Sequence, residues 1–223
     1  MPVKVVVING NIGSGKTSVL DMIKGMFGES KNGTVIQENV ADWGYYLNKF
    51  YTSKIKEEKE NYCYKLHFSI LYHFACAVKQ VEMLKETLKD GSNFTVFIER
   101  SPYDVREIFL DLNRGNINQI QSGVLMTACN LMYQDEVWKN ATYIFLEAEP
   151  ELCKDRIEAR GRQGEENISI EYLNKLDENY RGLFDRLLRD FGENRVIKIK
   201  VNNKMTVKEV ADVVENVMKV AEY

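Results

Sequence analysis

The residues with the clearest chemical meaning lie near the start of the sequence, in the stretch GNIGSGKTS, residues 10–18. Gly10, Gly15, Lys16 and Thr17 match the pattern Gly-x4-Gly-Lys-Ser/Thr of a phosphate-binding loop. In such a loop the backbone N–H groups face phosphate oxygens, the lysine reaches the β- and γ-phosphates, and the hydroxyl group is a ligand of Mg²⁺. The pattern predicts a nucleotide site made of Gly10, Asn11, Ile12, Gly13, Ser14, Gly15, Lys16, Thr17 and Ser18.

Charged side chains also follow two apolar segments that are expected to be strands. The segment FTVFI, residues 94–98, is followed by Glu99 and Arg100, and TVIQ, residues 34–37, is followed by Glu38. Residues at the carboxyl ends of parallel strands face the ligand crevice of an α/β sheet. We therefore expect Glu99 near the Mg²⁺, Arg100 near the transferring phosphoryl group, and Glu38 as a carboxylate that accepts a proton. A surface ion pair is the alternative for Glu99 and Arg100, and a strand-end glutamate is common enough that Glu38 alone decides nothing.

Three arginines lie close together in KDRIEARGRQGEE, residues 154–166. Arg156 and Arg160 share a helical face, and Arg162 lies at the edge of the following loop. Three guanidinium groups can clamp the phosphates of ATP and neutralise charge in the transition state. We predict a lid over the phosphate loop at about residues 156–167, and the alternative is a solvated basic helix face.

The rest of the sequence predicts an α/β scaffold for these side chains. Apolar segments rich in β-branched or aromatic residues predict five strands, and apolar residues at helical spacing predict helices among them. Most of the strand segments lack alternation, as in a parallel sheet buried on both faces, whereas the last alternates like an edge strand. Strands that alternate with helices indicate an open parallel sheet with right-handed crossovers. The expected strands are 3–8, 34–37, 94–98, 142–146 and 195–201, the expected helices 18–27, 62–89, 169–191 and 206–223, and the expected loops 52–61 and 162–167.

Composition narrows the function classes. The chain has 223 residues, a length that favours one domain (1–223). Its formal net charge of −3 does not favour a nucleic-acid binder. No apolar run could span a bilayer and no signal-peptide pattern precedes the phosphate loop, so we expect a cytoplasmic protein without a membrane partner. The four cysteines form no Cys-x-x-Cys pair, so a zinc site is not expected.

Two short motifs point to other nucleotide enzymes, but their context argues against both. NKLD, residues 174–177, resembles the guanine-reading motif of GTPases, yet it falls inside an expected helix, and the sequence has no Asp-x-x-Gly. DFG, residues 190–192, occurs without the catalytic loop of protein kinases, and Gly192 is better explained as a helix end.

Together these motifs resemble the deoxyribonucleoside kinase family, the P-loop enzymes related to insect, mitochondrial and viral deoxynucleoside kinases. The resemblance covers roughly residues 3–190 and is carried by GNIGSGKTS, QENVADW, ERSPYDVREIF and YIFLEAEPELCKDRIEARGRQGEENISIEYL. It implies a three-layer sandwich of the P-loop type, with a five-stranded parallel sheet surrounded by helices and an arginine-rich lid. It also implies ATP and Mg²⁺ as cofactors, a deoxyribonucleoside substrate and a homodimer.

The resemblance implies a role for each matching residue. Glu38 would take the proton of the 5′-hydroxyl group, Arg100 would steady the reacting groups, and Lys16 would act on the phosphates. Thr17 and Glu99 would hold Mg²⁺, and the three lid arginines would cover the phosphates of ATP. The substrate site would be made of Glu38, Trp43, Tyr51, His67, Arg100, Val105, Phe109 and Glu165. Within it, Glu165 and Tyr51 would bind the 3′-hydroxyl group, and Trp43 and Phe109 would wall the base pocket.

Three positions depart from the family pattern. Asn39 stands where the family usually has proline, and His67 aligns with the glutamine that hydrogen-bonds the base. A histidine side chain can also donate and accept hydrogen bonds, so His67 could read the base. Alternatively, His67 is only a half-buried helix residue, or the loop at 52–61 has shifted the alignment at this position. Val105 aligns with an aspartate of the cytidine-preferring branch. Because an apolar side chain leaves room for a methyl group, the sequence favours thymidine or broad pyrimidine use.

Two other functions remain as alternatives. A nucleoside monophosphate kinase of the thymidylate type would need a further arginine for the acceptor phosphate, such as Arg106 or Arg114. A nucleotide-gated binding protein without small-molecule chemistry would leave Glu38, Glu99 and the lid without a purpose. Both alternatives would keep the phosphate loop.

Overall fold

The computed structural model describes the backbone of residues 3–30, 32–38, 40–88, 93–162 and 165–220. Five strands form one parallel sheet in the order β2-β3-β1-β4-β5. The strands are β1 (Val3–Gly10), β2 (Gly33–Ile36), β3 (Phe94–Glu99), β4 (Thr142–Ala148) and β5 (Val196–Val201). All five strands expected from the apolar segments are therefore present, and the alternating one, β5, lies at an edge.

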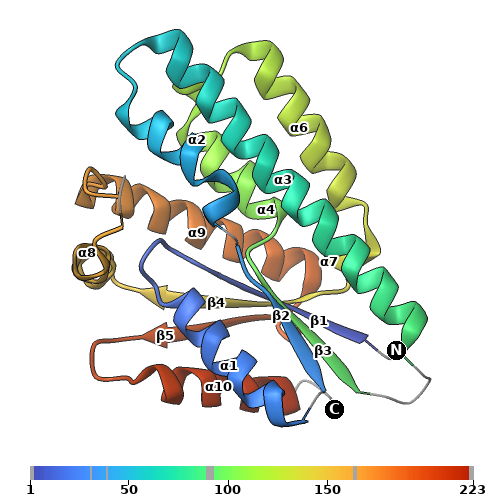
Figure 1. The fold of residues 1–223 in the computed structure, drawn as a ribbon. Coiled ribbons are helices and arrows are strands. Elements are labelled where there is room, and N and C mark those ends of the chain that lie inside the picture. The colour runs from blue at the N-terminus through green and yellow to red at the C-terminus, as the bar shows by residue number, and fades with distance from the viewer. Residues whose placement is uncertain (1–2, 31, 39, 89–92, 163–164, 221–223) are drawn as a thin grey trace.

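Helices cover both faces of this sheet (Figure 1). The helices α1 (Lys16–Ser30) and α10 (Val207–Val220) pack together on one face, where Phe27 of α1 contacts Phe97 of β3. The other face carries α3 (Lys56–Thr87), α6 (Gln119–Tyr133) and α9 (Ile170–Phe191), and Phe184 of α9 contacts Phe145 of β4. The expected three-layer α/β sandwich is confirmed.

The remaining segments are shorter or lie at the rim of the sheet. They are α2 (Val40–Thr52), α4 (Pro102–Asp104), a π-helical segment η1 (Val105–Phe109), α5 (Leu110–Leu112), a 3₁₀ turn η2 (Arg114–Asn116), α7 (Glu136–Lys139) and α8 (Pro150–Arg160). From α4 to α5 the chain is one continuous helical stretch. A π-helical turn inside a helix is often found at a functional site.

One predicted loop is partly wrong. Residues 52–61 were expected to be a loop, but α3 begins at Lys56. The reason is electrostatic rather than apolar, since Glu57 and Glu58 lie in the first helical turn, where the helix dipole favours negative charge. Lys56 and Glu60 also pair at i,i+4 across 3.8 Å, and the Ser53 hydroxyl group donates to Glu58 over 2.9 Å.

The predicted helices are otherwise confirmed with shifted ends. The NKLD segment lies inside α9 with Leu173 and Leu176 buried, and Gly192 ends that helix at φ 81°, as expected. The end of the predicted helix 62–89, at Lys89, and the last residues of the predicted helix 206–223 lie outside the described residues. So do Asn39 and part of the predicted loop 162–167.

Candidate active site

The phosphate loop joins the end of β1 to the start of α1. Gly10, Gly13 and Gly15 have φ of 145°, 81° and 100°, a region that favours glycine. A Cβ on Gly13 would lie 2.5 Å from the carbonyl oxygen of Cys153, and one on Gly10 would lie 2.6 Å from that of Leu146. The loop therefore passes so close to β4 and α8 that side chains are excluded at both positions.

Lys16 closes the loop on itself. Its Nζ atom donates to the carbonyl oxygens of Gly10, over 2.9 Å, and Asn11, over 2.8 Å. Burial, and then the nearby charge of Arg100, lower the pKa of the Lys16 ammonium group to about 8. A phosphate would restore part of the lost solvation, so the side chain is suited to an anionic ligand.

Asn11 holds the loop from behind. Its Nδ2 atom donates to the carbonyl oxygen of Leu173 on α9 over 2.9 Å, and its Oδ1 atom accepts from the N–H group of Ile12 over 2.8 Å. Gly10 and Asn11 do not line the cavity at this site, whereas the other predicted loop residues, Ile12 to Ser18, all do.

Thr17 and Glu99 meet at the mouth of the loop, as predicted. The Thr17 hydroxyl group donates to Oε1 of Glu99 over 3.0 Å. One hydroxyl and one carboxylate oxygen fit Mg²⁺, which in proteins usually keeps several waters and takes its remaining ligands from substrate phosphates. Among the described residues no group of three or more His, Cys, Asp or Glu side chains could hold a metal ion.

Glu38 and Arg100 form a buried ion pair beside the loop. Arg100 Nη1 donates to a Glu38 carboxylate oxygen, and each side chain is only 10% exposed. Arg100 has a left-handed backbone with φ 64°, unusual for a residue other than glycine and a form of strain that concentrates at functional sites. Its guanidinium group lies 5.3 Å above the ring of Phe109.

Burial is the main cause of the pKa shift of Glu38. It raises the pKa of this carboxyl group to about 6, while Arg100 opposes the rise, Glu99 adds to it and Lys16 opposes it. A carboxylate with a pKa near 6 is ionised at neutral pH and still basic enough to take a proton in a transition state.

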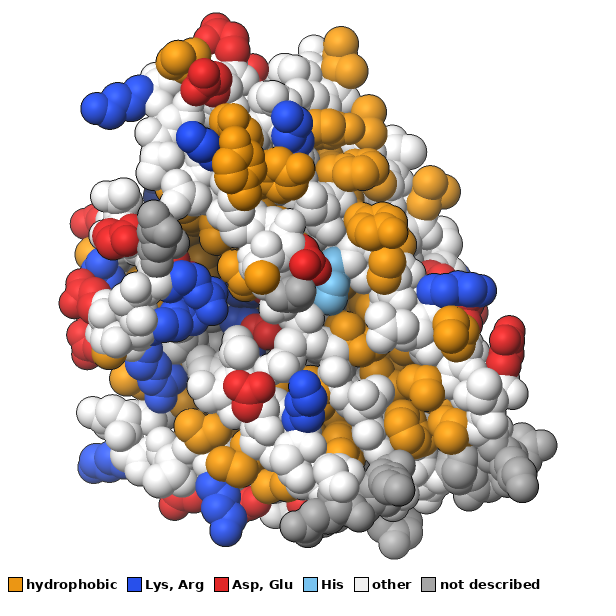
Figure 2. Space-filling model, in the orientation of Figure 1, with side chains coloured by type: hydrophobic (Ala, Val, Ile, Leu, Met, Phe, Trp, Pro, Cys, Tyr) orange, Lys and Arg blue, Asp and Glu red, His pale blue; other side chains and the backbone are white. Residues whose placement is uncertain are grey.

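The cavity at the loop has a volume of about 550 Å³ and continues from the phosphate loop to an apolar end. Figure 2 shows a hollow in this face of the molecule, bordered by basic side chains. The apolar end is lined by Val40, Trp43, Leu47, Phe50, Leu66, Ile70 and Phe109. A planar base would fit between such side chains, and Trp43 and Phe109 are among them as predicted.

Val105 is the one predicted substrate residue that the structure places elsewhere. It is 1% exposed, belongs to the hydrophobic core and does not line the cavity. The segment η1, which Val105 begins, packs against α3, α6 and α9, and Val105 lies in this packed interior. The proposed room for a thymine methyl group therefore does not exist at this position.

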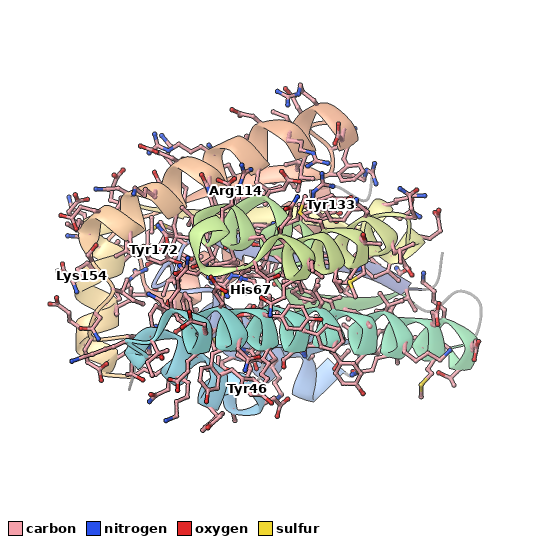
Figure 3. All side chains as sticks on the ribbon, turned by 90° about the horizontal axis from the view of Figure 1, so that it is seen from above. Tyr46, His67, Arg114, Tyr133, Lys154 and Tyr172 are labelled. Atoms are coloured by element: carbon pink, nitrogen blue, oxygen red, sulfur yellow. The ribbon has the colours of Figure 1, made fainter. Side chains whose placement is uncertain are left out.

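His67 lies on the inner side of α3, with Tyr172 at the start of α9 (Figure 3). The His67 ring is 2% exposed, lines the cavity, and has its Nδ1 atom 2.7 Å from the carbonyl oxygen of Cys63. Burial lowers the pKa of His67 to about 4, so the ring is neutral at neutral pH. Because a carbonyl oxygen only accepts, Nδ1 must carry the proton, and Nε2 is left as an acceptor.

The lid arginines contact two parts of the site. Arg156 Nη1 donates to the carbonyl oxygens of Ser14, over 3.1 Å, and Gly13, over 3.4 Å. Arg160 and Arg162 both pair with Glu165, across 2.6 and 3.3 Å. The three arginines and Glu165 line the same cavity as the phosphate loop, and Arg156 is the one of them with a hydrogen bond to that loop among the described contacts.

Several cavity residues were not predicted. Tyr172 and Asn113 line the cavity near Tyr51, and Val201, Met205, Val207 and Val210 line it from β5 and α10. The helix α2 was also missed, although the spacing of Trp43, Leu47 and Phe50 on one helical face is a signal for it. Tyr172 lies at the end of the last motif that carries the resemblance but was given no role, and no local pattern marks Asn113.

Comparison with known proteins decides the family. A family model described as deoxynucleoside kinase matches residues 6–222. The chain belongs to the deoxynucleoside kinase family. Deoxynucleoside kinases phosphorylate nucleosides, and the family implies ATP as the phosphate donor, so this chain is a kinase with a nucleoside substrate.

Individual deoxynucleoside kinases and related proteins resemble the chain over most of its length. Putative kinase protein 029R of Invertebrate iridescent virus 3 is 29% identical over 180 residues, which are 80% of this chain and 81% of that protein. Deoxycytidine kinase of Mus musculus is 28% identical over 207 residues, covering 78% of this chain and 72% of that enzyme.

A solved structure shares the fold. It is a deoxyadenosine kinase from M. mycoides with the products dCMP and a flexible dCDP bound, and it matches with a TM-score of 0.69 at 20% identity. The match covers 97% of this chain and 99% of that chain.

In the part of the chain that the structure describes, none of the helices combines the length and apolar character needed to cross a bilayer.

Proposed function

We propose that this kinase transfers the γ-phosphoryl group of Mg·ATP to the 5′-hydroxyl group of a deoxyribonucleoside. The observation that carries the proposal is the Glu38–Arg100 pair, which lines one continuous cavity between the phosphate loop and an apolar end. In this proposal the proton acceptor and the cation lie between the donor and acceptor subsites. The new bond joins the 5′-oxygen to the γ-phosphorus, the bond to the β-phosphate oxygen breaks, and ADP leaves.

The donor side is assigned to the phosphate loop and the lid. Lys16, with Arg156, Arg160 and Arg162, neutralises phosphate charge. Thr17 and Glu99 would hold Mg²⁺, which would offset the charge of the phosphates. The apolar side chains of Met205, Val207 and Val210 offer a surface for the adenine ring.

The acceptor side is assigned to the other end of the cavity. Glu38 takes the proton of the 5′-hydroxyl group, and Arg100 holds the carboxylate and the reacting oxygens in place. Tyr51 and Glu165 bind the 3′-hydroxyl group, while Trp43 and Phe109 enclose the base. His67 presents Nε2 as a hydrogen-bond acceptor to the base edge.

The base preference is open to measurement. Thymidine or broad pyrimidine use was favoured because of Val105, and that support is lost now that Val105 lies in the core. What supports a base reader is His67, whose acceptor can receive an N–H group of any of the four bases.

A nucleoside fits the acceptor site better than a nucleoside monophosphate. An acceptor phosphate would need a further cation, and Arg106 and Arg114 were the candidates. Arg106 pairs with Glu107 over 3.3 Å and Arg114 with Asp111 over 2.6 Å, and neither lines the cavity.

We also propose that the chain acts as one kinase domain and as a homodimer. Large apolar side chains are exposed on α3 and α6, which pack side by side, and Figure 2 shows such side chains gathered over this part of the surface. They include Phe68, Tyr72, Met83, Ile120, Val124 and Leu131. Contiguous apolar surface of this kind marks protein interfaces. Light scattering of the purified chain, with Ile120→Lys and Leu131→Lys as variants, tests the dimer.

The decisive experiment scores phosphorylated product from Mg·ATP with thymidine, deoxycytidine, deoxyadenosine, deoxyguanosine and thymidine monophosphate. Product from one or more nucleosides supports the proposal and ranks the bases. Product from the monophosphate alone would reassign the chain to the monophosphate kinases. Slow ATP hydrolysis that no nucleoside changes would favour the binding-protein alternative.

A further inference from the structure

A tyrosine outside the cavity connects the Glu38–Arg100 pair to a third buried charge. The Tyr180 hydroxyl group on α9 accepts from Nε of Arg100 over 3.1 Å and donates to Oδ1 of Asp104 over 3.0 Å. Tyr180 is 5% exposed and Asp104 is 0% exposed. Neither side chain lines the cavity, so Tyr180 can affect the reacting groups only through Arg100, whereas Asp104 can also act on them through its charge.

The direction of these hydrogen bonds is fixed by chemistry. The other carboxylate oxygen of Asp104 accepts from the backbone N–H of Ser101, over 2.9 Å, and from its hydroxyl group, over 2.8 Å. Arg100 has only donors and an ionised Asp104 only acceptors, so a hydroxyl group that receives one proton and gives one is suited to lie between them. Phenylalanine could not replace this link.

Three contacts together hold the Arg100 side chain in place. The Arg100 N–H group continues the β1–β3 pairing by donating to the carbonyl oxygen of Ile8 over 3.1 Å. The backbone of Arg100 then turns with a φ of 64°. The guanidinium group is bound to Glu38 through Nη1 and lies over the Phe109 ring. The bond from Nε to Tyr180 adds a third point, which defines the plane of the group.

We propose that Tyr180 is a positioning residue of the reaction, whose hydroxyl group holds the Arg100 guanidinium against Glu38 and connects it to the buried carboxylate of Asp104. The inference rests on the proposed function, because it assumes that Glu38 is the base. The charged groups that act on Glu38 are Arg100 and Glu99 at the end of β3, Lys16 of α1 and Asp104 of α4. Arg100 is the strongest of them and is the one that Tyr180 holds.

The test is Tyr180→Phe, assayed with the nucleoside that the wild-type enzyme uses best. We expect kcat to fall at least about tenfold, the size of effect expected when a residue that orients a functional group is removed. The KM for ATP should change less than about twofold. The acid limb of kcat/KM for the nucleoside should move to higher pH, because a loosened Arg100 stabilises the Glu38 carboxylate less.

Tyr143→Phe is the matched control. Tyr143 is also fully buried, and its hydroxyl group donates to the carbonyl oxygen of Trp138 over 2.6 Å, away from the cavity. Its loss should lower the unfolding temperature but leave kcat and the acid limb unchanged. If Tyr180→Phe behaved like this control, the positioning role would be wrong and Tyr180 would serve stability alone.

Asp104→Asn is a second variant that keeps the inference testable if Tyr180→Phe does not fold. The charge of Asp104 raises the pKa of Glu38, so its removal should move the acid limb to lower pH, opposite to Tyr180→Phe. An unmoved limb in Asp104→Asn would overturn the connection between Asp104 and the Glu38–Arg100 pair. An inactive wild-type enzyme would instead refute the proposed function, so the two failures are distinguishable.

Discussion

Glu38 and Arg100 lie two residues beyond the same rung of the sheet, since Ile36 of β2 pairs with Ile98 of β3. Parallel pairing of neighbouring strands therefore brings together two side chains that are 62 positions apart in the sequence. The pair forms at the carboxyl edge of the sheet, beside the phosphate loop that follows β1. One register thus creates the central element of the proposed acceptor site.

The first prediction concerns Glu38→Gln. The amide can still accept from Arg100, so the pocket should keep its shape, but it cannot accept a proton at neutral pH. We expect kcat to fall at least about 10²-fold, the usual contribution of a general base, while ATP binding measured by calorimetry is unchanged. Near-normal turnover in this variant would remove Glu38 from the mechanism.

The second prediction concerns pH. Burial raises the pKa of Glu38 to about 6, so the basic form is lost as the pH falls through that value. At saturating ATP, kcat/KM for the nucleoside should be flat from pH 7 to 8 and fall about tenfold per unit well below pH 6. The residual activity of Glu38→Gln should lack this limb, which separates the titration of Glu38 from that of ATP.

The motifs could be found from the sequence because each depends on a local arrangement. The phosphate loop needs glycines at fixed spacing, and the strands can be predicted from apolar segments that end in charged residues. Glu38, Glu99 and Arg100 were placed at one edge because all parallel strands end there. These expectations agree with the contacts that the structure shows.

Other features depend on packing between distant segments and have no local pattern. Tyr180 looks like one more member of the apolar stripe of α9, and its hydrogen bonds to Arg100 and Asp104 appear only when α9 lies beside α4. Val105 was expected in the base pocket by alignment alone, but the packing of η1 against three helices places it in the core. Alignment gives the position of a residue along the chain but not the direction of its side chain.

The third prediction concerns Gly13→Ala. The new Cβ would lie 2.5 Å from the carbonyl oxygen of Cys153 and would sit on a backbone with φ 81°. The loop and α8 must then separate, which also displaces Arg156 from the carbonyl oxygens of Gly13 and Ser14. We expect the free energy of unfolding to fall by about 1–3 kcal/mol and ATP to bind more weakly in calorimetry.

Gly182→Ala is the control for this prediction. Gly182 lies within α9 and a Cβ there meets no atom within 4 Å. Alanine should stabilise the helix by about 0.5–1 kcal/mol without changing ATP affinity. Equal effects of the two substitutions in urea unfolding would contradict the close approach of the phosphate loop to α8.

The last prediction tests whether His67 reads the base or only packs within α3. If its Nε2 atom accepts an N–H group of the base, His67→Phe should raise the KM for the nucleoside about tenfold, the value of roughly one hydrogen bond, with kcat nearly unchanged. His67→Gln should restore binding and alter the order of the four nucleosides, because an amide adds a donor beside the acceptor. Since burial lowers the pKa of His67 to about 4, the wild-type KM should show no histidine titration between pH 6 and 8. An unchanged KM in His67→Phe, together with a lower unfolding temperature, would mean that His67 only packs within α3 and that the apolar walls alone select the base.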